Sequence, residues 1–140
     1  MMVSTKGRYA LQVMLYLADN KDGGYMPLKD IAERENISQK YLESIMTVLS
    51  KAGMVDALHG KGGGYRLNRD PDDYTVASVL RVAEGNLAPV ACVETEGASC
   101  EKSESCRTLP MWLRLNEMIN DYFEGITVGE LARTTLTDNG

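Results

Sequence analysis

The stretch "HGKGGGYRL" at residues 59–67 is the most informative in the chain, because three consecutive glycines stand between a lysine and a tyrosine. Glycine runs are costly to order, but they tolerate positive φ and the close approach of another backbone. The run therefore indicates either a phosphate-binding loop between a strand and a helix or the tip of a β-hairpin. The flanking stretches "MVDAL" (54–58) and "YRL" (65–67) have strand-like residues, and "NRDPDD" (68–73) has turn chemistry. The Lys-Ser/Thr pair of a phosphate-binding loop is absent, so the sequence predicts a hairpin with a basic, glycine-rich tip.

Upstream of this hairpin, the sequence predicts two short helices joined by about three residues. Residues 26–37 form the first, with Pro27 suited to a first helical turn. Ser38 is placed to cap the second helix, residues 39–53, and Gly53 is a natural terminator. This pair is typical of a helix-turn-helix, and the hairpin that follows adds a wing. A further helix is predicted over residues 4–20, capped by Ser4 or Thr5. The expected fold is mainly α with a small β-wing, a winged helix-turn-helix.

Downstream, we expect a helix at residues 75–84, a loop over 86–106, a long amphipathic helix over 109–126 and a short one near 127–133. The apolar residues assigned to one side of the long helix are Trp112, Leu115, Ile119, Tyr122 and Phe123. That helix has more apolar surface than so small a winged domain can cover. We therefore predict an isologous homodimer formed through it; the alternative is a helix folded back onto its own domain. The expected division is a winged helix-turn-helix DNA-binding domain at 1–85, a cysteine-containing loop at 86–107 and a dimerisation helix with tail at 108–140.

Charge is distributed unevenly along the 140 residues. The net charge is −5. Residues 1–69 hold ten Lys/Arg and seven Asp/Glu (+3), whereas residues 70–140 hold five and thirteen (−8), which together give −5. This asymmetry indicates a basic, polyanion-facing half and an acidic remainder, although a solvated surface would look the same. No apolar run is long enough for a membrane helix and no signal-peptide core is visible, so we expect a cytoplasmic protein without a membrane partner.

The second helix of a helix-turn-helix enters the major groove with its N-terminal residues at base edges. The residues in that position are Ser38, Gln39, Lys40, Tyr41, Glu43 and Ser44. Gln39 can pair with adenine and Glu43 can accept from the cytosine amino group. Each has a plainer interpretation, because Glu43 can be a solvated helix charge and Tyr41 a half-buried packing residue.

Basic residues outside that helix are the candidate phosphate contacts. Lys6 and Arg8 near the N-terminus, together with Lys40, can neutralise phosphates. The predicted wing carries His59, Gly60, Lys61 and Arg66 close to its cluster of backbone amides. A narrow minor groove attracts such cations.

Three cysteines, Cys92, Cys100 and Cys106, lie within fifteen residues. An odd number in a cytoplasmic chain does not indicate a disulfide framework, and clustering favours metal or redox chemistry. The options are an iron–sulfur cluster, which takes four protein donors, a thiol switch, a zinc site, or three unligated thiols. Nearby oxygen donors for a fourth ligand are Glu94, Glu96, Glu101 and Glu104.

Catalytic signatures are absent. The single histidine, His59, lies in the glycine hairpin far from the cysteines in sequence. No Ser-His-Asp or Cys-His pairing is evident, and neither is a nucleotide fingerprint. The sequence therefore predicts a protein that is not an enzyme. A winged-fold adaptor that has lost DNA binding is the remaining alternative, and the basic residues of the helix and wing argue against it.

Taken in order along the chain, the motifs resemble the Rrf-type winged-helix regulators of bacteria, the group of IscR, NsrR and CymR. The matching stretches are "STKGRYAL" (4–11), "PLKDIAERENIS" (27–38), "YLESIM" (41–46), "LSKAGMV" (49–55), "GKGGGYRL" (60–67), "VLRVAEG" (79–85) and "ITVGEL" (126–131). The resemblance implies a homodimeric transcription regulator, expected to be a repressor, that binds palindromic double-stranded promoter DNA. It implies that Tyr41 and Glu43 read bases and that the wing enters the minor groove. It also implies that residues 86–107 are a sensor loop, with a two-iron, two-sulfur cluster on Cys92, Cys100 and Cys106.

The chain departs from this family pattern at several positions. IscR-type members carry a histidine three residues after the third cysteine, where this chain has Leu109. NsrR-type members use an acidic residue near the start of the first helix, where this chain has Arg8. His59 stands where the family often has arginine, and seven residues separate Cys92 from Cys100. CymR-type members lack the cysteines and sense metabolism through a partner enzyme. A cluster-free regulator of sulfur metabolism, with such an enzyme partner, and a thiol-switch regulator are therefore the alternatives.

Overall fold

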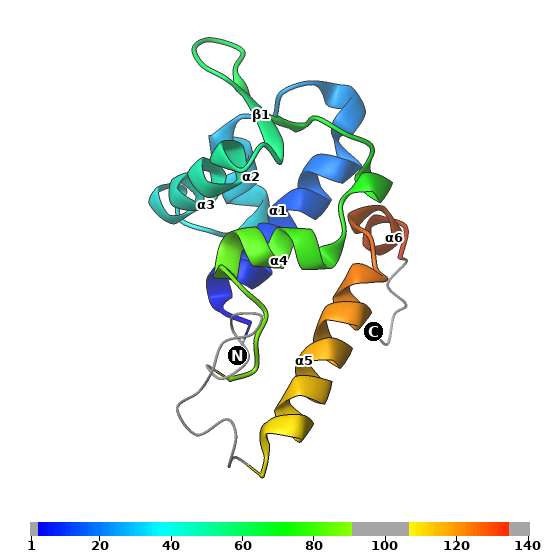
Figure 1. The fold of residues 1–140 in the computed structure, drawn as a ribbon. Helices are drawn as coiled ribbons and strands as arrows, with labels where there is room; N and C mark the ends of the chain where they lie inside the picture. The colour runs from blue at the N-terminus through cyan, green and yellow to red at the C-terminus, as the bar shows by residue number, and fades with distance from the viewer. Residues whose placement is uncertain (1–2, 91–106, 135–140) are drawn as a thin grey trace, which may run out of the picture.

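A computed structural model of the chain describes residues 3–90 and 107–134. The described elements, in chain order, are α1 (Thr5–Asp19), η1 (Lys21–Gly23), α2 (Leu28–Glu35), α3 (Gln39–Lys51), β1 (Val55–Leu58), β2 (Gly64–Leu67), η2 (Pro71–Asp73), α4 (Val76–Glu84), α5 (Leu109–Glu124) and α6 (Val128–Ala132). Figure 1 shows the helices gathered around α1, with the β1–β2 hairpin and α5 extending in opposite directions. The prediction of a mainly α winged helix-turn-helix is confirmed.

Hydroxyl side chains begin the helices as the sequence indicated. The Ser4 hydroxyl accepts a hydrogen bond from the Gly7 N–H at the start of α1. The Ser38 hydroxyl accepts from the Tyr41 N–H at the start of α3. Each cap satisfies a helix-end N–H that has no partner within the helix. Pro27 lies one position earlier than predicted, immediately before the first residue of α2.

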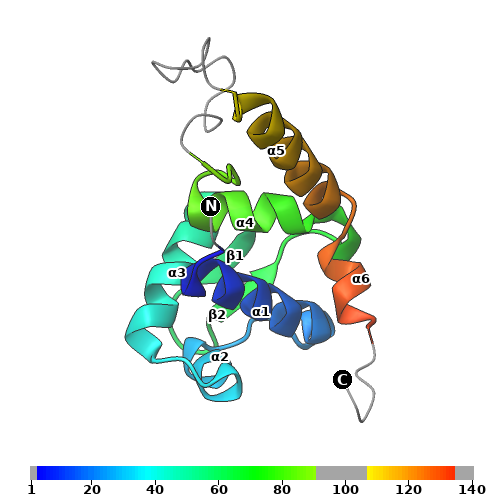
Figure 2. The same cartoon turned by 90° about the horizontal axis from the view of Figure 1, so that it is seen from below.

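Helix α1 lies at the centre of the packed unit, in contact with α2, α3, α4, α6 and β2. Its buried face repeats at three- and four-residue intervals and meets the buried faces of the other helices. The side chains that are essentially inaccessible to solvent include Met14, Leu17, Ile31, Leu42, Ile45, Met46, Leu49, Tyr74 and Val79. Figure 2, seen from below, shows α1 between α3 and α6. This core fixes the position of α3 relative to α1 and the wing.

The wing is an antiparallel hairpin extended by one further backbone pair. Val55 pairs with Leu67 and Leu58 pairs with Gly64. On its other side, Tyr65 exchanges two backbone hydrogen bonds with Met26, at 2.8 and 2.9 Å. Gly64 has φ +151°, and a Cβ at this position would overlap the carbonyl of Met26. The close approach of two backbones therefore requires the last glycine of the run to be glycine.

The chain after α5 returns to the winged domain. Val76 N–H donates to the Ile126 carbonyl and Val128 N–H donates to the Tyr74 carbonyl, each at 2.8 Å. Helix α6 then packs on α1 and η2. Arg133 forms an ion pair with Asp72 at 2.9 Å, and its hydrogen bond holds the pKa of the Asp72 carboxyl below its ordinary value. Residues 126–134 are thereby attached to the same packed unit as the wing.

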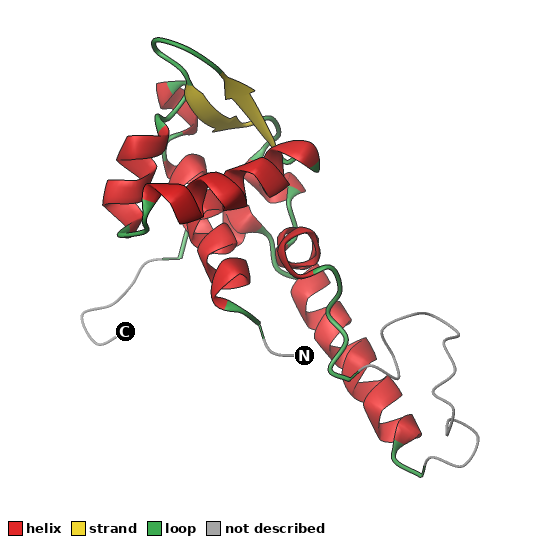
Figure 3. Cartoon of the chain, turned by 90° about the vertical axis from the view of Figure 1, so that its left-hand side faces the viewer, coloured by secondary structure: helices red, strands yellow, loops and turns green. Residues whose placement is uncertain are grey.

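Helix α5 carries one broad apolar face, only part of which is packed in the single chain. Trp112, Ile119 and Phe123 are partly buried, and the latter two pack with the α4 residues of a small second core. Leu115 and Tyr122 are exposed and lie at the other edge of this face, together with Met111 and Met118. At 3.6 residues per turn, the five apolar residues assigned to one side fall within an arc of about 100°. In the single chain, one edge of this arc packs against α4 and the other edge is exposed. Figure 3 shows α5 extending away from the wing.

Candidate nucleic-acid interface

Helices α2 and α3 form the predicted helix-turn-helix. Asn36 adopts the left-handed conformation, with φ 54° and ψ 47°, at the end of α2. Asparagine tolerates this conformation better than most residues, which allows the chain to turn within three residues. Leu42, Ile45 and Leu49 face the core. The opposite face of α3 is therefore directed to solvent.

Six α3 or cap residues were predicted at the DNA surface, and the structure separates them by what their side chains already contact. Gln39, Lys40 and Glu43 are exposed, and their side chains form no hydrogen bond or ion pair within residues 3–90 and 107–134. The Ser44 hydroxyl donates to the Tyr41 carbonyl at 2.6 Å. The ends of the first three side chains are therefore available to a ligand, whereas the Ser44 hydroxyl can offer only its acceptor side.

Tyr41 and Ser38 have structural roles in addition to their predicted ones. The Tyr41 ring is half-buried and meets the Tyr9 ring of α1 edge to face, with centroids 5.7 Å apart. Ser38 caps α3. Thr47, one turn beyond Glu43, is exposed on the same face, and its hydroxyl donates to the Glu43 carbonyl. Helical spacing from Glu43 was the signal that could have added Thr47 to the candidate residues.

Basic residues lie on two further parts of this unit. Arg8, in the first turns of α1, is exposed, and Lys6 beside it is partly exposed. At the wing tip, His59, Gly60 and Lys61 are exposed. The Gly60 carbonyl accepts from the Gly63 N–H at 3.1 Å, which closes the tip. Within the described ranges, none of these basic side chains belongs to an ion pair. The charges of Lys6, Arg8 and Lys61 are therefore free to attract a polyanion.

Arg66 differs from the other basic residues because it has partners. Its guanidinium lies over the Tyr25 ring, 4.4 Å from the centroid. Its Nε atom lies 3.7 Å from the Asp56 carboxylate. Arg66 is thus the one candidate DNA contact in the described part of the wing whose orientation is fixed by neighbouring side chains.

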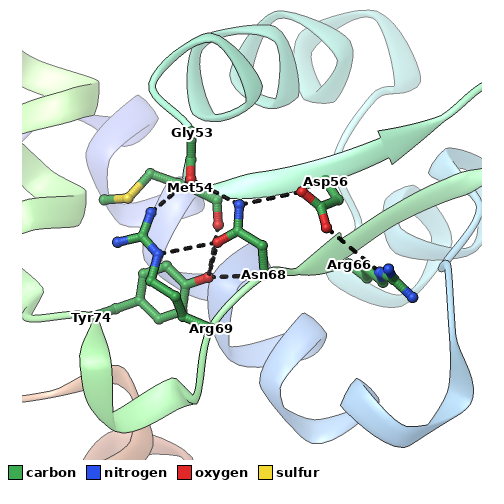
Figure 4. A network of polar contacts seen from close by, with 7 residues as sticks. All are labelled: Gly53, Met54, Asp56, Arg66, Asn68, Arg69 and Tyr74. Atoms are coloured by element: carbon green, nitrogen blue, oxygen red, sulfur yellow. Dashed lines mark hydrogen bonds and ion pairs between the residues drawn. The ribbon is translucent and has the colours of Figure 1, made fainter.

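A polar network at the root of the wing was not predicted from the sequence (Figure 4). Tyr74 is buried, and its hydroxyl lies 2.9 Å from the Met54 carbonyl and accepts from the Asn68 N–H at 3.1 Å. The Asn68 amide donates to the Gly53 carbonyl at 2.9 Å and lies 3.4 Å from the Asp56 carboxylate. Burial raises the pKa of the Tyr74 hydroxyl, so it stays neutral and able to donate. The network joins the end of α3 to both strands of the wing.

The three cysteines of the predicted sensor loop, Cys92, Cys100 and Cys106, lie outside the described residues. Before them, Leu87 and Ala88 are buried, and Leu87 belongs to the small core shared with α5. Leu109 begins α5 after them. Within residues 3–90 and 107–134, no group of three or more His, Cys, Asp or Glu side chains could hold a metal ion.

Comparison with known proteins assigns the family. A family model described as "Rrf2: Iron-dependent Transcriptional regulator" matches residues 3–134. The chain belongs to the Rrf2 family. The "HTH-type transcriptional regulator IscR" of Aliivibrio salmonicida is 39% identical over 131 residues, which are 94% of this chain and 77% of that protein. The IscR of Escherichia coli O1:K1 / APEC is 36% identical over 132 residues, 94% of this chain and 80% of the relative.

Solved structures of Rrf2 regulators have the same fold. CymR, "the Global Cysteine Regulator of B. subtilis", superposes with a TM-score of 0.80 at 33% identity, covering 97% of this chain and 99% of that one. The IscR of T. potens superposes with a TM-score of 0.75 at 33% identity, covering 98% and 94%.

These likenesses confirm the resemblance stated from the sequence. The chain is an Rrf2-type transcriptional regulator with a DNA-binding winged helix, and its relatives are named as regulators and not as enzymes. They do not support the predicted metabolic-enzyme partner. In residues 3–90 and 107–134, no helix is both long and apolar enough to cross a membrane.

Proposed function

We propose that this Rrf2 regulator acts as a homodimer that binds palindromic promoter DNA. The observation that carries the proposal is the outward face of α3, where Gln39, Lys40 and Glu43 are exposed without partners among the described residues. In a helix-turn-helix these positions meet base edges and phosphates. Lys6, Arg8 and the basic wing tip would extend the contact along the backbone on either side.

Dimerisation is supported by the exposed apolar stripe of α5, defined here as Met111, Leu115, Met118 and Tyr122. These positions follow one another at intervals of four, three and four residues, the spacing of a coiled-coil seam. Their side chains are 54%, 37%, 52% and 66% exposed in the single chain. A second copy of α5 packed antiparallel or crossed on this stripe would cover them. Two winged domains related by a two-fold axis fit a palindromic operator.

The DNA interaction can be tested by replacing Lys40 with alanine. Operator-length duplexes would be selected from a random-sequence pool with the wild-type protein, and affinity measured by fluorescence anisotropy at several salt concentrations. The salt slope should fall by roughly 0.9 for each phosphate that Lys40 no longer neutralises. Lys21→Ala, in η1 outside the helix-turn-helix, removes the same charge and should leave the slope nearly unchanged. Equal slopes for Lys40→Ala and wild type would contradict the proposed role of α3.

For the sensor, we propose that Cys92, Cys100 and Cys106 hold an iron–sulfur cluster. Thiolates are the donors that such clusters take, and three cysteines close in sequence supply three of the four protein donors of a two-iron cluster. Leu109 cannot serve as the fourth, so an oxygen donor from Glu94, Glu96, Glu101, Glu104 or the other subunit would complete it. The family description "iron-dependent" and the relatives named IscR support this assignment. Such a cluster would supply a signal, because it can be reversibly oxidised and reduced or reversibly lost.

Protein purified without oxygen should be brown, with visible charge-transfer absorption and matching amounts of iron and sulfide. Cys106→Ala should lose most of this colour. Leu109→His, which restores the histidine of IscR-type members, should keep the colour and lose it in air more slowly than the wild type. Operator affinity is expected to differ between the loaded and the cluster-free protein, because a switch needs a ligand that favours one of two states. Equal affinities would remove the switch while leaving the cluster assignment intact.

A cluster-free redox regulator is the second candidate. It is favoured by Leu109 in place of a histidine and by the likeness to CymR structures, one of them titled an "oxidized form". A colourless anaerobic protein whose operator affinity changes on mild oxidation would identify this alternative, with a thiol–disulfide change among the same three cysteines.

A further inference from the structure

Three side chains form a row across the wing, one from each neighbouring backbone segment. Asp56 in β1 lies directly opposite Arg66 in β2. Because Met26 pairs antiparallel with Tyr65, the preceding residue Tyr25 lies beside Arg66 on its other side. Arg66 is therefore held between a carboxylate 3.7 Å from its Nε and an aromatic ring 4.4 Å from its guanidinium carbon.

We propose that Asp56 and Tyr25 are positioning residues that set how Arg66 binds a DNA phosphate and thereby increase the preference for specific over non-specific DNA. This inference rests on the proposed DNA-binding function. Asp56 lies on the Nε side of the guanidinium, and the guanidinium carbon lies over the Tyr25 ring. Within residues 3–90 and 107–134 neither terminal nitrogen of Arg66 donates a hydrogen bond, so both can be offered to a phosphate in the forked geometry that suits it.

Asp56 is itself held in place by the network at the root of the wing. The Asn68 amide lies 3.4 Å from one Asp56 oxygen, while the other oxygen pairs with Arg66. Asn68 is bonded in turn to the Gly53 carbonyl and the buried Tyr74 (Figure 4). A continuous series of contacts thus runs from the end of the recognition helix to Arg66. The contacts around this guanidinium therefore include groups bonded to the residue that follows α3 by two positions, Gly53.

The Asp56 carboxylate should lower the electrostatic attraction between the wing and DNA. Asp56 offsets the charge of Arg66 and would itself be repelled by phosphates. An arginine with its own carboxylate is a weaker attractor of DNA in general, but one that loses less side-chain freedom when a phosphate arrives in the correct place. Removing the carboxylate should therefore raise non-specific affinity more than operator affinity. The wing tip, with Lys61 unpaired among the described residues, has no such restraint.

The test is a double-mutant cycle of Asp56→Asn and Arg66→Ala. Asparagine keeps the shape and one oxygen for Asn68 but removes the charge. With the selected operator and a scrambled duplex of equal length, Asp56→Asn should tighten binding to the scrambled duplex by about threefold or more at low salt. It should steepen the salt slope by up to roughly 0.9 per subunit and lower the operator-to-scrambled ratio. In the Arg66→Ala background these changes should be reduced to the smaller long-range effect of the missing acidic charge.

Tyr25→Leu tests the other side of the row, because it keeps an apolar cover but removes the aromatic face. It should lower the operator-to-scrambled ratio without changing net charge. Thermal unfolding of every variant separates positioning from loss of the fold. If Asp56→Asn changes affinity for both duplexes equally, and does so whether or not Arg66 is present, Asp56 does not act through Arg66 and the inference is overturned. If the wild type bound the operator and the scrambled duplex equally well, the proposed function itself would be contradicted.

Discussion

Replacing Met118 with glutamate is expected to convert the proposed dimer into a monomer. Met118 lies in the middle of the exposed apolar stripe of α5 and is 52% exposed in the single chain. Around a two-fold axis, the substitution would bring two carboxylates close together within an apolar interface. Burying an unpaired charge costs several kcal/mol. A loss of about 3 kcal/mol would weaken the dimer by roughly 100-fold, since each 1.4 kcal/mol is a factor of ten.

The measurement is sedimentation or light scattering across a range of concentrations, followed by operator binding. A monomer should bind the full palindrome no better than a half-site, because the second recognition helix is no longer attached. Leu113→Glu is the matched control, since Leu113 is 50% exposed on the same helix but lies off the Met111–Leu115–Met118–Tyr122 stripe. If both variants remain dimeric, or if the wild type is a monomer, the stripe is not the dimer interface.

The second large effect is expected from replacing Gly64 with alanine. The added methyl would overlap the Met26 carbonyl at a residue whose φ is +151°. Backbone strain of this kind costs on the order of 1–3 kcal/mol, and here it can be relieved only by separating β2 from Met26. The wing would then lose its attachment to the segment before α2. We expect operator affinity to fall by tenfold or more, with a smaller decrease in melting temperature.

Gly62→Ala is the comparison that isolates the overlap. Gly62 also has positive φ, +78°, but nothing lies within 4 Å of an added Cβ. This variant should incur the strain of a left-handed alanine, about 1–2 kcal/mol, without detaching the wing. Backbone amide exchange at Tyr65, whose N–H donates to the Met26 carbonyl at 2.9 Å, reports detachment directly. Unchanged protection of that amide in Gly64→Ala would contradict the prediction.

The features that the sequence predicted well are those set by local chemistry. Ser38 and Gly53 bound the recognition helix because capping and a left-handed glycine act within one turn. The hairpin follows from the glycine run and its flanks. These signals depend on neighbouring residues alone, so one amino-acid sequence is enough to recognise them.

What the sequence missed depends on contacts between distant segments. The pairing of Met26 with Tyr65 and the Asn68–Tyr74 network depend on how helices and wing pack, and no periodicity encodes them. Helix α5 has one broad apolar face, so its pattern could not distinguish the part packed on α4 from the part that is exposed. The predicted base and phosphate contacts, the cluster and the sensor-loop boundaries stay predictions.

Tyr74 has a mechanical significance that follows from its two sets of bonds. Its backbone carbonyl accepts from Val128, just beyond α5, while its hydroxyl lies against the Met54 carbonyl where α3 gives way to β1. Tyr74 therefore connects the segment that follows α5, the helix proposed to join the subunits, to the residues between α3 and the wing. A tilt of α5 would reach the base of the wing by way of Tyr74, which couples the two mechanically.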